Sequence, residues 1–216
     1  MLSDVNGEYP AMESAEIRTA EGNRYTVFSL WDTYRNLHQL LTLVYPERQL
    51  EMVRSMVGMY REWGWLPKWE LYGRETFTME GDPSIPVIVD TWMKGLRDFD
   101  MDAAYEAMRK SATTPGARNR MRPDIDPYIE KGYVPLGFYA RDLSGDNSVS
   151  HALEYYIADH ALSLLADSLG KKDDAALFRA RSLGYKNYYS TESGTFRPIT
   201  KEGKFLSLIH ISEPTR

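Results

Sequence analysis

Apolar residues recur at helical spacing along this chain, in segments that come in pairs. Residues at positions i, i+3, i+4 and i+7 share one face of a helix, so this spacing predicts amphipathic helices. About six segments carry it: Leu37, Leu40, Leu41, Val44; Leu50, Val53, Val57, Tyr60; Ile85, Ile88, Val89, Trp92, Leu96; Tyr105, Met108, Ala112; Leu153, Ile157, Ala161, Leu164; Ala176, Ala180, Leu183. Strand-like alternation is weak, with one faint case at 24–28. We therefore predict an all-α fold.

The predicted connections alternate in length. They are short inside a pair, at Tyr45-Pro46 and at Gly170-Lys171, and long between pairs, at 64–82 and 115–147. This alternation indicates three consecutive αα-hairpins with functional residues on the side of the long loops. No repeat of about 34 residues is present, which disfavours a tetratricopeptide array.

Composition excludes several classes of protein. The 216 residues include 43% apolar residues, enough for a hydrophobic core in one domain or part of a larger one. A net charge of −5 argues against a nucleic-acid-binding protein. The absence of cysteine excludes disulfides and zinc–thiolate sites. No apolar run approaches the roughly 20 residues of a membrane helix, and residues 1–16 do not resemble a signal peptide.

The last eleven residues, "LSLIHISEPTR", match no pattern upstream. They resemble a translated sequencing-library adapter. We therefore predict that 1–205 belong to the folded domain and that 206–216 form a non-native tail.

No metal site is predicted. The acidic stretches 98–102 and 124–126 begin like calcium loops but lack Gly at the sixth position and Glu at the twelfth. A helix start near Asp102 accounts for the first of them. A helical zinc site needs two histidines at i, i+4 spacing, and no two of His38, His151 and His160 have this spacing. Nucleophile-elbow, Walker and dinucleotide-binding motifs are also missing from the sequence.

Glu154 lies in the second turn of a predicted helix, within "SVSHALEYY". Acids are favoured near helix N-termini by the helix dipole, which is one explanation for it. The other is chemical, because a carboxyl enclosed by Leu153 and Tyr155 would retain a proton and could act as a general acid. From these residues alone, both interpretations remain open.

Two aromatic stretches are further candidates. "FSLWDTYR" places Trp31 and Asp32 at a helix start, where Asp32 is either a first-turn acid or a ligand-binding residue. "WGWLPKWELYG" places Trp65 and Trp69 in a loop, where such rings either cover the domain's own core or bind a ligand such as a sugar.

Six blocks, in this order, resemble glycoside hydrolase family 92: "FSLWDTYR", "GWLPKW", "GDPSIPVIVDTWMKG", "DFDMDAAYEAM", "GYVP" and "SVSHALEY". The resemblance extends over 2–205. That family consists of calcium-dependent, inverting exo-α-mannosidases with a β-sandwich domain followed by an (α/α)6 barrel. The resemblance implies that this chain is an internal piece of the catalytic domain, a partial barrel of about three hairpins.

The resemblance also implies roles for residues. The family's general acid falls on Glu154, and Trp31 and Asp32 fall where the mannose subsite is lined. Ala152 stands where relatives often have Thr, and "YIADH" stands where "AYDDW" is common, but Glu154 is retained. The blocks that carry the family's general base and calcium ligands are not found in this sequence. The resemblance therefore implies that the base and the calcium site belong to the full-length protein and are missing from this chain. We expect the chain alone to be inactive.

The expected substrate is a mannose-containing glycan, and the implied location is periplasmic, cell-surface or secreted in a bacterium. Linkage preference and oligomeric state are not indicated. Two alternatives remain at this point: a non-catalytic helical-repeat module that binds glycan or peptide, and another (α/α)6 glycosidase or lyase.

Overall fold

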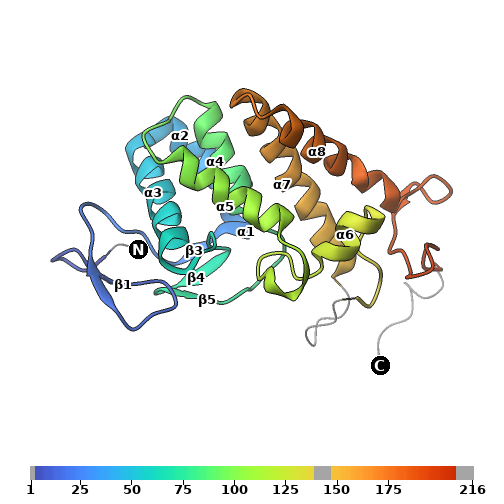
Figure 1. Cartoon of the computed structure of the whole chain (residues 1–216), viewed down its shortest axis with the longest axis horizontal. Coiled ribbons are helices and arrows are strands. Elements are labelled where there is room, and N and C mark those ends of the chain that lie inside the picture. The colour runs from blue at the N-terminus through green and yellow to red at the C-terminus, as the bar shows by residue number, and fades with distance from the viewer. Residues whose placement is uncertain (1–2, 139–146, 208–216) are drawn as a thin grey trace.

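The computed structural model describes residues 3–138 and 147–207 (Figure 1). The α-helices in these residues are α1 (Leu30–Thr33), α2 (Leu37–Val44), α3 (Pro46–Trp63), α4 (Ser84–Met93), α5 (Met101–Thr113), α6 (Ile125–Lys131), α7 (Ser148–Ser168) and α8 (Lys172–Ser182). Two 3-10 helices, η1 (Gly116–Arg118) and η2 (Leu183–Tyr188), complete the helical part. The strands are β1 (Glu8–Pro10), β2 (Ile17–Thr19), β3 (Phe28–Ser29), β4 (Trp69–Leu71), β5 (Arg74–Glu75), β6 (Tyr189–Ser190) and β7 (Thr195–Phe196).

Helices are present in all six predicted segments, and two of the predicted pairs, α2–α3 and α7–α8, pack against each other. In the third pair α4 and α5 follow each other along the chain, but α4 packs mainly against α7. Tyr45 alone separates α2 from α3, and Pro46 occupies the first turn of α3, where its missing N–H is harmless. Gly64 ends α3 in the left-handed conformation, with φ of +89°. Asp100 caps α5 by accepting a hydrogen bond from the Ala103 N–H at 3.0 Å, so this acidic stretch starts a helix.

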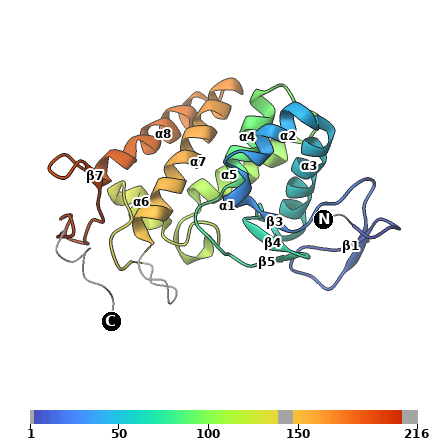
Figure 2. The same cartoon turned by 180° about the vertical axis from the view of Figure 1, so that it is seen from behind.

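The main hydrophobic core lies where α3, α4, α5, α7 and α8 pack together (Figures 1 and 2). On α7 the core face is formed by Ala158, Leu162 and Leu165, which are fully or almost fully buried. The predicted core stripe of α7 was different, and Ile157 and Leu164 are exposed. Because α7 carries apolar residues on several sides, the spacing identified the helix but not the side that faces the core.

The apolar stripe of α2 also differs from the prediction. Leu37, Leu40 and Val44 are exposed, while Leu41 is buried. Leu96 lies beyond the end of α4 at Met93. In both segments the helical spacing was correct, but burial was decided by which neighbours pack against the helix.

The prediction of a wholly helical chain is not confirmed, because the described residues contain three small antiparallel sheets, β1–β2, β3–β4–β5 and β6–β7. Their strands are two or three residues long, too short for an alternating pattern. Buried carboxylates hold the middle sheet. Glu70 accepts hydrogen bonds from the N–H groups of Val27 and Gly73, and Glu75 accepts from the Lys68 and Trp69 N–H groups.

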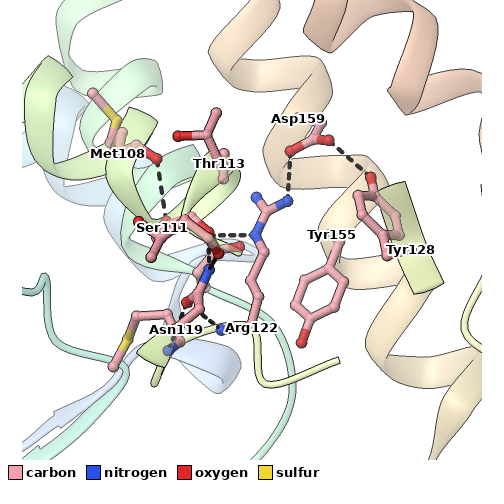
Figure 3. Close-up of polar contacts among 12 residues, drawn as sticks. Met108, Ser111, Thr113, Asn119, Arg122, Tyr128, Tyr155 and Asp159 are labelled. Atoms are coloured by element: carbon pink, nitrogen blue, oxygen red, sulfur yellow. Dashed lines mark hydrogen bonds and ion pairs between the residues drawn. The ribbon is translucent and has the colours of Figure 1, made fainter. Parts of the chain in front are cut away.

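A buried charged network, shown in Figure 3, joins three helical segments. The guanidinium of Arg122, which is fully buried, donates to Asp82 from Nε at 2.9 Å and to Asp159 on α7 from Nη1 at 2.7 Å. Tyr128 on α6 donates to the second oxygen of Asp159 at 2.8 Å, and Ser111 on α5 donates to Asp82 at 2.7 Å. Burial alone would lower the pKa of Arg122, but Asp159 and Asp82 outweigh it and raise that pKa. The network therefore ties the segment before α4 to α5, α6 and α7.

Only the first two residues of the predicted tail are described. The Leu206 N–H donates to the Pro198 carbonyl at 2.9 Å, and Leu206 is half-buried. Residues 208–216 lie outside the described part of the chain, so the non-native tail stays a prediction. In the described residues no helix is long and apolar enough to cross a membrane.

Candidate active site

Glu154 projects from the second turn of α7 toward α1 and is nearly buried, with 11% of its side chain exposed. The Tyr34 hydroxyl donates to Oε2 at 2.7 Å, and Arg35 Nη2 lies 2.8 Å from Oε1. Burial and the bond to Glu154 raise the pKa of Tyr34, so this hydroxyl remains a donor at neutral pH. The sequence predicted that Leu153 and Tyr155 enclose the Glu154 carboxyl. However, the groups that bond the carboxylate are polar. Tyr155 instead turns into the core, where its hydroxyl bonds Asp124.

The segment before α4 closes one side of Glu154. Gly81 adopts φ of +76°, and a Cβ built on it would stand 2.6 Å from Glu154 Cβ. Such an approach is possible only for glycine, which has neither a Cβ nor a penalty for positive φ. Asp82, the next residue, is held in the buried network around Arg122. That network therefore fixes the backbone against which Glu154 packs.

Replacement of Gly81 by alanine is expected to destabilise the chain and to displace Glu154. Gly95 has a similar φ of +88° but open space around its missing Cβ, so Gly95→Ala reports backbone strain alone. We expect Gly81→Ala to lower the free energy of unfolding by about 1–3 kcal/mol more than Gly95→Ala does. Urea denaturation of both variants measures this difference, and equal losses would contradict the close packing of Gly81 on Glu154.

Trp31 and Asp32 lie on the same short helix, α1, that leads to Tyr34 and Arg35. The Arg35 guanidinium stacks over the Trp31 ring, 4.5 Å from its centroid. Among the described residues the buried Trp31 indole N–H has no hydrogen-bond partner. Asp32 is exposed and accepts a hydrogen bond from Ser29. The structure therefore places Trp31 beside the group that contacts Glu154.

The structure places Trp65 and Trp69 in different surroundings. Trp69 lies in β4, paired with Ser29 in β3, which brings it next to the segment that carries Asp32. Trp65 is 8% exposed, and the Lys110 ammonium lies 4.6 Å from its ring centroid. Little of the Trp65 ring is exposed, and the ring packs as part of the domain interior, so its proposed contact with substrate stays a prediction.

A second polar cluster occupies the preceding turn of α7. Ser150 donates to Glu80 at 3.0 Å, and His151 Nδ1 lies 3.0 Å from the buried carboxylate of Asp124. The other ring nitrogen of His151 faces Glu80 at 4.0 Å. Because Ser150 and Glu154 are one helical turn apart, Glu80 and Glu154 lie over adjacent turns of one face of α7.

Sequence reasoning missed four residues of this site: Tyr34, Arg35, Glu80 and Gly81. Tyr34 and Arg35 belong to the block "FSLWDTYR" and carry a signal, since they lie directly after the helix that contains Trp31. Gly81 opens the block "GDPSIPVIVDTWMKG", but its approach to Glu154, 73 residues away, is a tertiary contact that the sequence does not show. Glu80 carried no signal, because it lies 70 residues from Ser150 along the chain.

The described residues do not form a metal site. They contain no group of three or more His, Asp or Glu side chains that could hold a metal ion. The calcium implied by the family resemblance therefore finds no fitting ligand set in 3–138 and 147–207.

Comparison with known proteins gives consistent results. The profile of the family described as "Glycosyl hydrolase family 92 catalytic domain" matches residues 1–214. The family GH92 α-mannosidase BT3965 from Bacteroides thetaiotaomicron, solved with mannoimidazole, is 34% identical with a TM-score of 0.84, over 96% of this chain and 26% of that one. The inverting GH92 mannosidase BT2199 from the same species is 30% identical with a TM-score of 0.82, over 92% of this chain and 26% of that one. An "Uncharacterized secreted glycosidase" from Arthroderma benhamiae is 28% identical over 146 residues, 65% of this chain and 19% of that protein.

The comparisons place the chain among the glycoside hydrolases. The family is glycosyl hydrolase family 92, and this chain belongs to it. The chain spans about a quarter of the length of the solved relatives.

Proposed function

We propose that this chain is part of an α-mannosidase that removes terminal α-linked mannose from glycans by single displacement with inversion, and that Glu154 is its general acid. The observation that carries the proposal is the position of Glu154. Its carboxylate is bonded by Tyr34 and Arg35, and its Cβ packs against Gly81. The Arg35 guanidinium in turn lies over the ring of Trp31. The solved relatives named above are mannosidases, one described as an α-mannosidase and the other as inverting, which supports this assignment.

In this mechanism Glu154 donates a proton to the glycosidic oxygen while the bond to the sugar breaks. A second carboxylate removes a proton from water that attacks the opposite face of the ring, and in inverting enzymes the two carboxyls stand ~6.5–9.5 Å apart. Trp31, Asp32 and Trp69 are proposed to line the subsite for the terminal mannose. An aromatic ring suits this task because the C–H face of a sugar packs against it.

We further propose that the three helix pairs are consecutive pairs of an (α/α)6 barrel, and that calcium acts in the complete protein through ligands outside the described residues. Since the described residues offer no metal site, no catalytic step is assigned to the ion here. Export from the cell fits a glycan substrate and the secreted relative.

The test is hydrolysis of an α-linked mannobiose by the complete gene product and by the 216-residue chain. We expect the complete product to release mannose, with the β-anomer appearing first in proton NMR spectra because the reaction inverts. Chelation should abolish this activity. We expect no turnover by the chain alone. Release of the α-anomer first would exclude single displacement, and turnover by the isolated chain would show that base and cofactor sites lie within it.

The two alternatives make different predictions. A binding module would retain glycan without releasing sugar in any form of the protein. Another (α/α)6 glycosidase or lyase would leave mannobiose intact but act on a different glycan, and a lyase would produce an unsaturated sugar detectable by ultraviolet absorbance.

A further inference from the structure

We propose that Arg35 is a removable counter-ion of Glu154: it holds the carboxylate in the free protein and separates from it when a glycan binds over Trp31. This inference rests on the proposed role of Glu154 as the general acid. It assigns to Arg35 a positioning role, since Arg35 acts on the reaction through Glu154.

Arg35 is anchored by stacking as well as by its ion pair. Its guanidinium lies between two rings, 4.5 Å from the centroid of Trp31 and 4.8 Å from that of Tyr34. From there it reaches Glu154 Oε1 at 2.8 Å. Stacking on aromatic faces and bonding to a carboxylate are the interactions for which a planar guanidinium is suited. A lysine could supply the charge but not the same stacking.

The ion pair between Arg35 and Glu154 conflicts with acid catalysis. A general acid must carry a proton, whereas a guanidinium stays charged at all accessible pH values and favours the ionised carboxylate beside it. The pair and the protonated acid therefore exclude each other. One of the two must give way before Glu154 can donate.

Exposure shows which partner can leave. The Arg35 side chain is 45% exposed, while that of Glu154 is 11% exposed. Ion pairs with a solvent-exposed partner are weak, so Arg35 can move into water without opening the core. Glu154 cannot move as easily, because Gly81 packs against its Cβ and Tyr34 holds Oε2.

The shared ring of Trp31 links this movement to the substrate. A sugar that stacks on the face of Trp31 occupied by Arg35 competes with the guanidinium for that face. When Arg35 leaves, Oε1 loses its partner while Oε2 keeps the hydrogen bond from Tyr34. Oε1 then takes up one proton from solvent, and this proton passes to the glycosidic oxygen as the sugar–oxygen bond breaks.

Other charged groups around Glu154 keep their places in this scheme. Glu80 precedes Gly81 and bonds Ser150, and His151 on α7 bonds Asp124. Asp32 on α1 accepts from Ser29. Lys68 is buried, and burial lowers its pKa although Glu75, Asp82, Asp124 and Glu80 oppose this. Among the described residues, the side-chain hydrogen bonds to the Glu154 carboxylate come from Tyr34 and Arg35, so Arg35 is the cation that the proposal moves.

The experiment compares Arg35→Gln with Arg35→Lys, which keeps the charge, in the complete gene product. The pH dependence of kcat/KM reports the free enzyme, and that of kcat reports the substrate complex. In the wild type we expect the alkaline limb of kcat/KM to lie at lower pH than that of kcat, because only the free enzyme holds the ion pair. In Arg35→Gln the kcat/KM limb should move up by about one pH unit and approach the kcat limb. Arg35→Lys should resemble the wild type.

A second readout does not need activity. Carbon-13 NMR of the glutamate side-chain carboxyls in the 216-residue chain, assigned with Glu154→Gln, follows the protonation of Glu154 directly. We expect Arg35→Gln to keep Glu154 protonated to higher pH. Unchanged limbs and an unchanged titration in Arg35→Gln would overturn the proposal. If the titration shifts but Glu154→Gln remains fully active on mannobiose, the ion pair is real and the proposed function has failed instead.

Discussion

Replacement of Glu154 by glutamine in the complete gene product is expected to lower kcat for α-linked mannobiose by about 10²- to 10⁴-fold. The amide is close to the carboxyl in shape and can still meet the hydroxyl of Tyr34, but it cannot donate a proton to the leaving oxygen. Since the carboxylate also bonds Arg35, the amide removes one ion pair whose cation is half-exposed. Such pairs contribute little to stability, so the variant should fold.

The choice of leaving group separates acid catalysis from a general loss of structure. In an aryl mannoside with an electron-poor ring, the phenolate leaves readily without being protonated. Glu154→Gln should therefore reduce the turnover of this substrate far less than that of mannobiose. Asp167→Asn, another carboxyl-to-amide change on α7, is a matched control, because Asp167 is exposed and its ion pair within the described residues is with Lys172 at the surface. It should leave both activities unchanged. Equal losses on the two substrates in Glu154→Gln would mean that Glu154 supports the site without donating the proton.

Replacement of Arg122 by methionine is expected to lower the free energy of unfolding by about 3–5 kcal/mol. Methionine fills a similar volume but leaves Asp82 and Asp159 buried without their counter-charge. Removing one partner of a buried pair is costly because the remaining charge stays out of water. The variant should also loosen the packing around Glu154, because Asp82 anchors the backbone at Gly81, which packs on Glu154. Urea denaturation followed by circular dichroism measures the change.

Arg54→Met is the matched control for Arg122. Arg54 pairs with Asp98 at the surface, where 40% of the arginine side chain and 87% of the aspartate side chain are exposed. We expect this variant to lose no more than about 1 kcal/mol. A similar loss in both variants would show that the Arg122 network adds no more than an exposed pair. Replacing Asp82 and Asp159 by leucine together with Arg122→Met should recover part of the loss, because no charge then remains buried.

Helical spacing was the strongest signal in the sequence, and the pairs α2–α3, α4–α5 and α7–α8 follow it. The signal works because a helix repeats every 3.6 residues, so a pattern within a dozen residues is enough to identify it. The same pattern failed for the buried face of α7, where Ile157 and Leu164 are exposed. A helix with apolar residues on several sides does not encode which side will be covered.

The short strands escaped prediction for a related reason. β3, β4 and β5 are held by Glu70 and Glu75, whose carboxylates bond backbone N–H groups from the same region of the chain. No residue pattern marks a glutamate that will be buried for this purpose.

By itself, the sequence determined the helix pairs, the resemblance to a glycosidase family, and Glu154, Trp31 and Asp32 as candidates, because each of these depends on residues close together in the chain. Only the tertiary structure decided what surrounds Glu154. Tyr34 and Arg35 approach it from 120 and 119 residues away, and Gly81 from 73 residues away. Such contacts arise from the packing of α1 and the segment before α4 against α7, and packing depends on the whole chain at once. The same physics placed Trp65 in the interior and Trp69 in β4 beside the start of α1, although the two residues lie close together in the sequence.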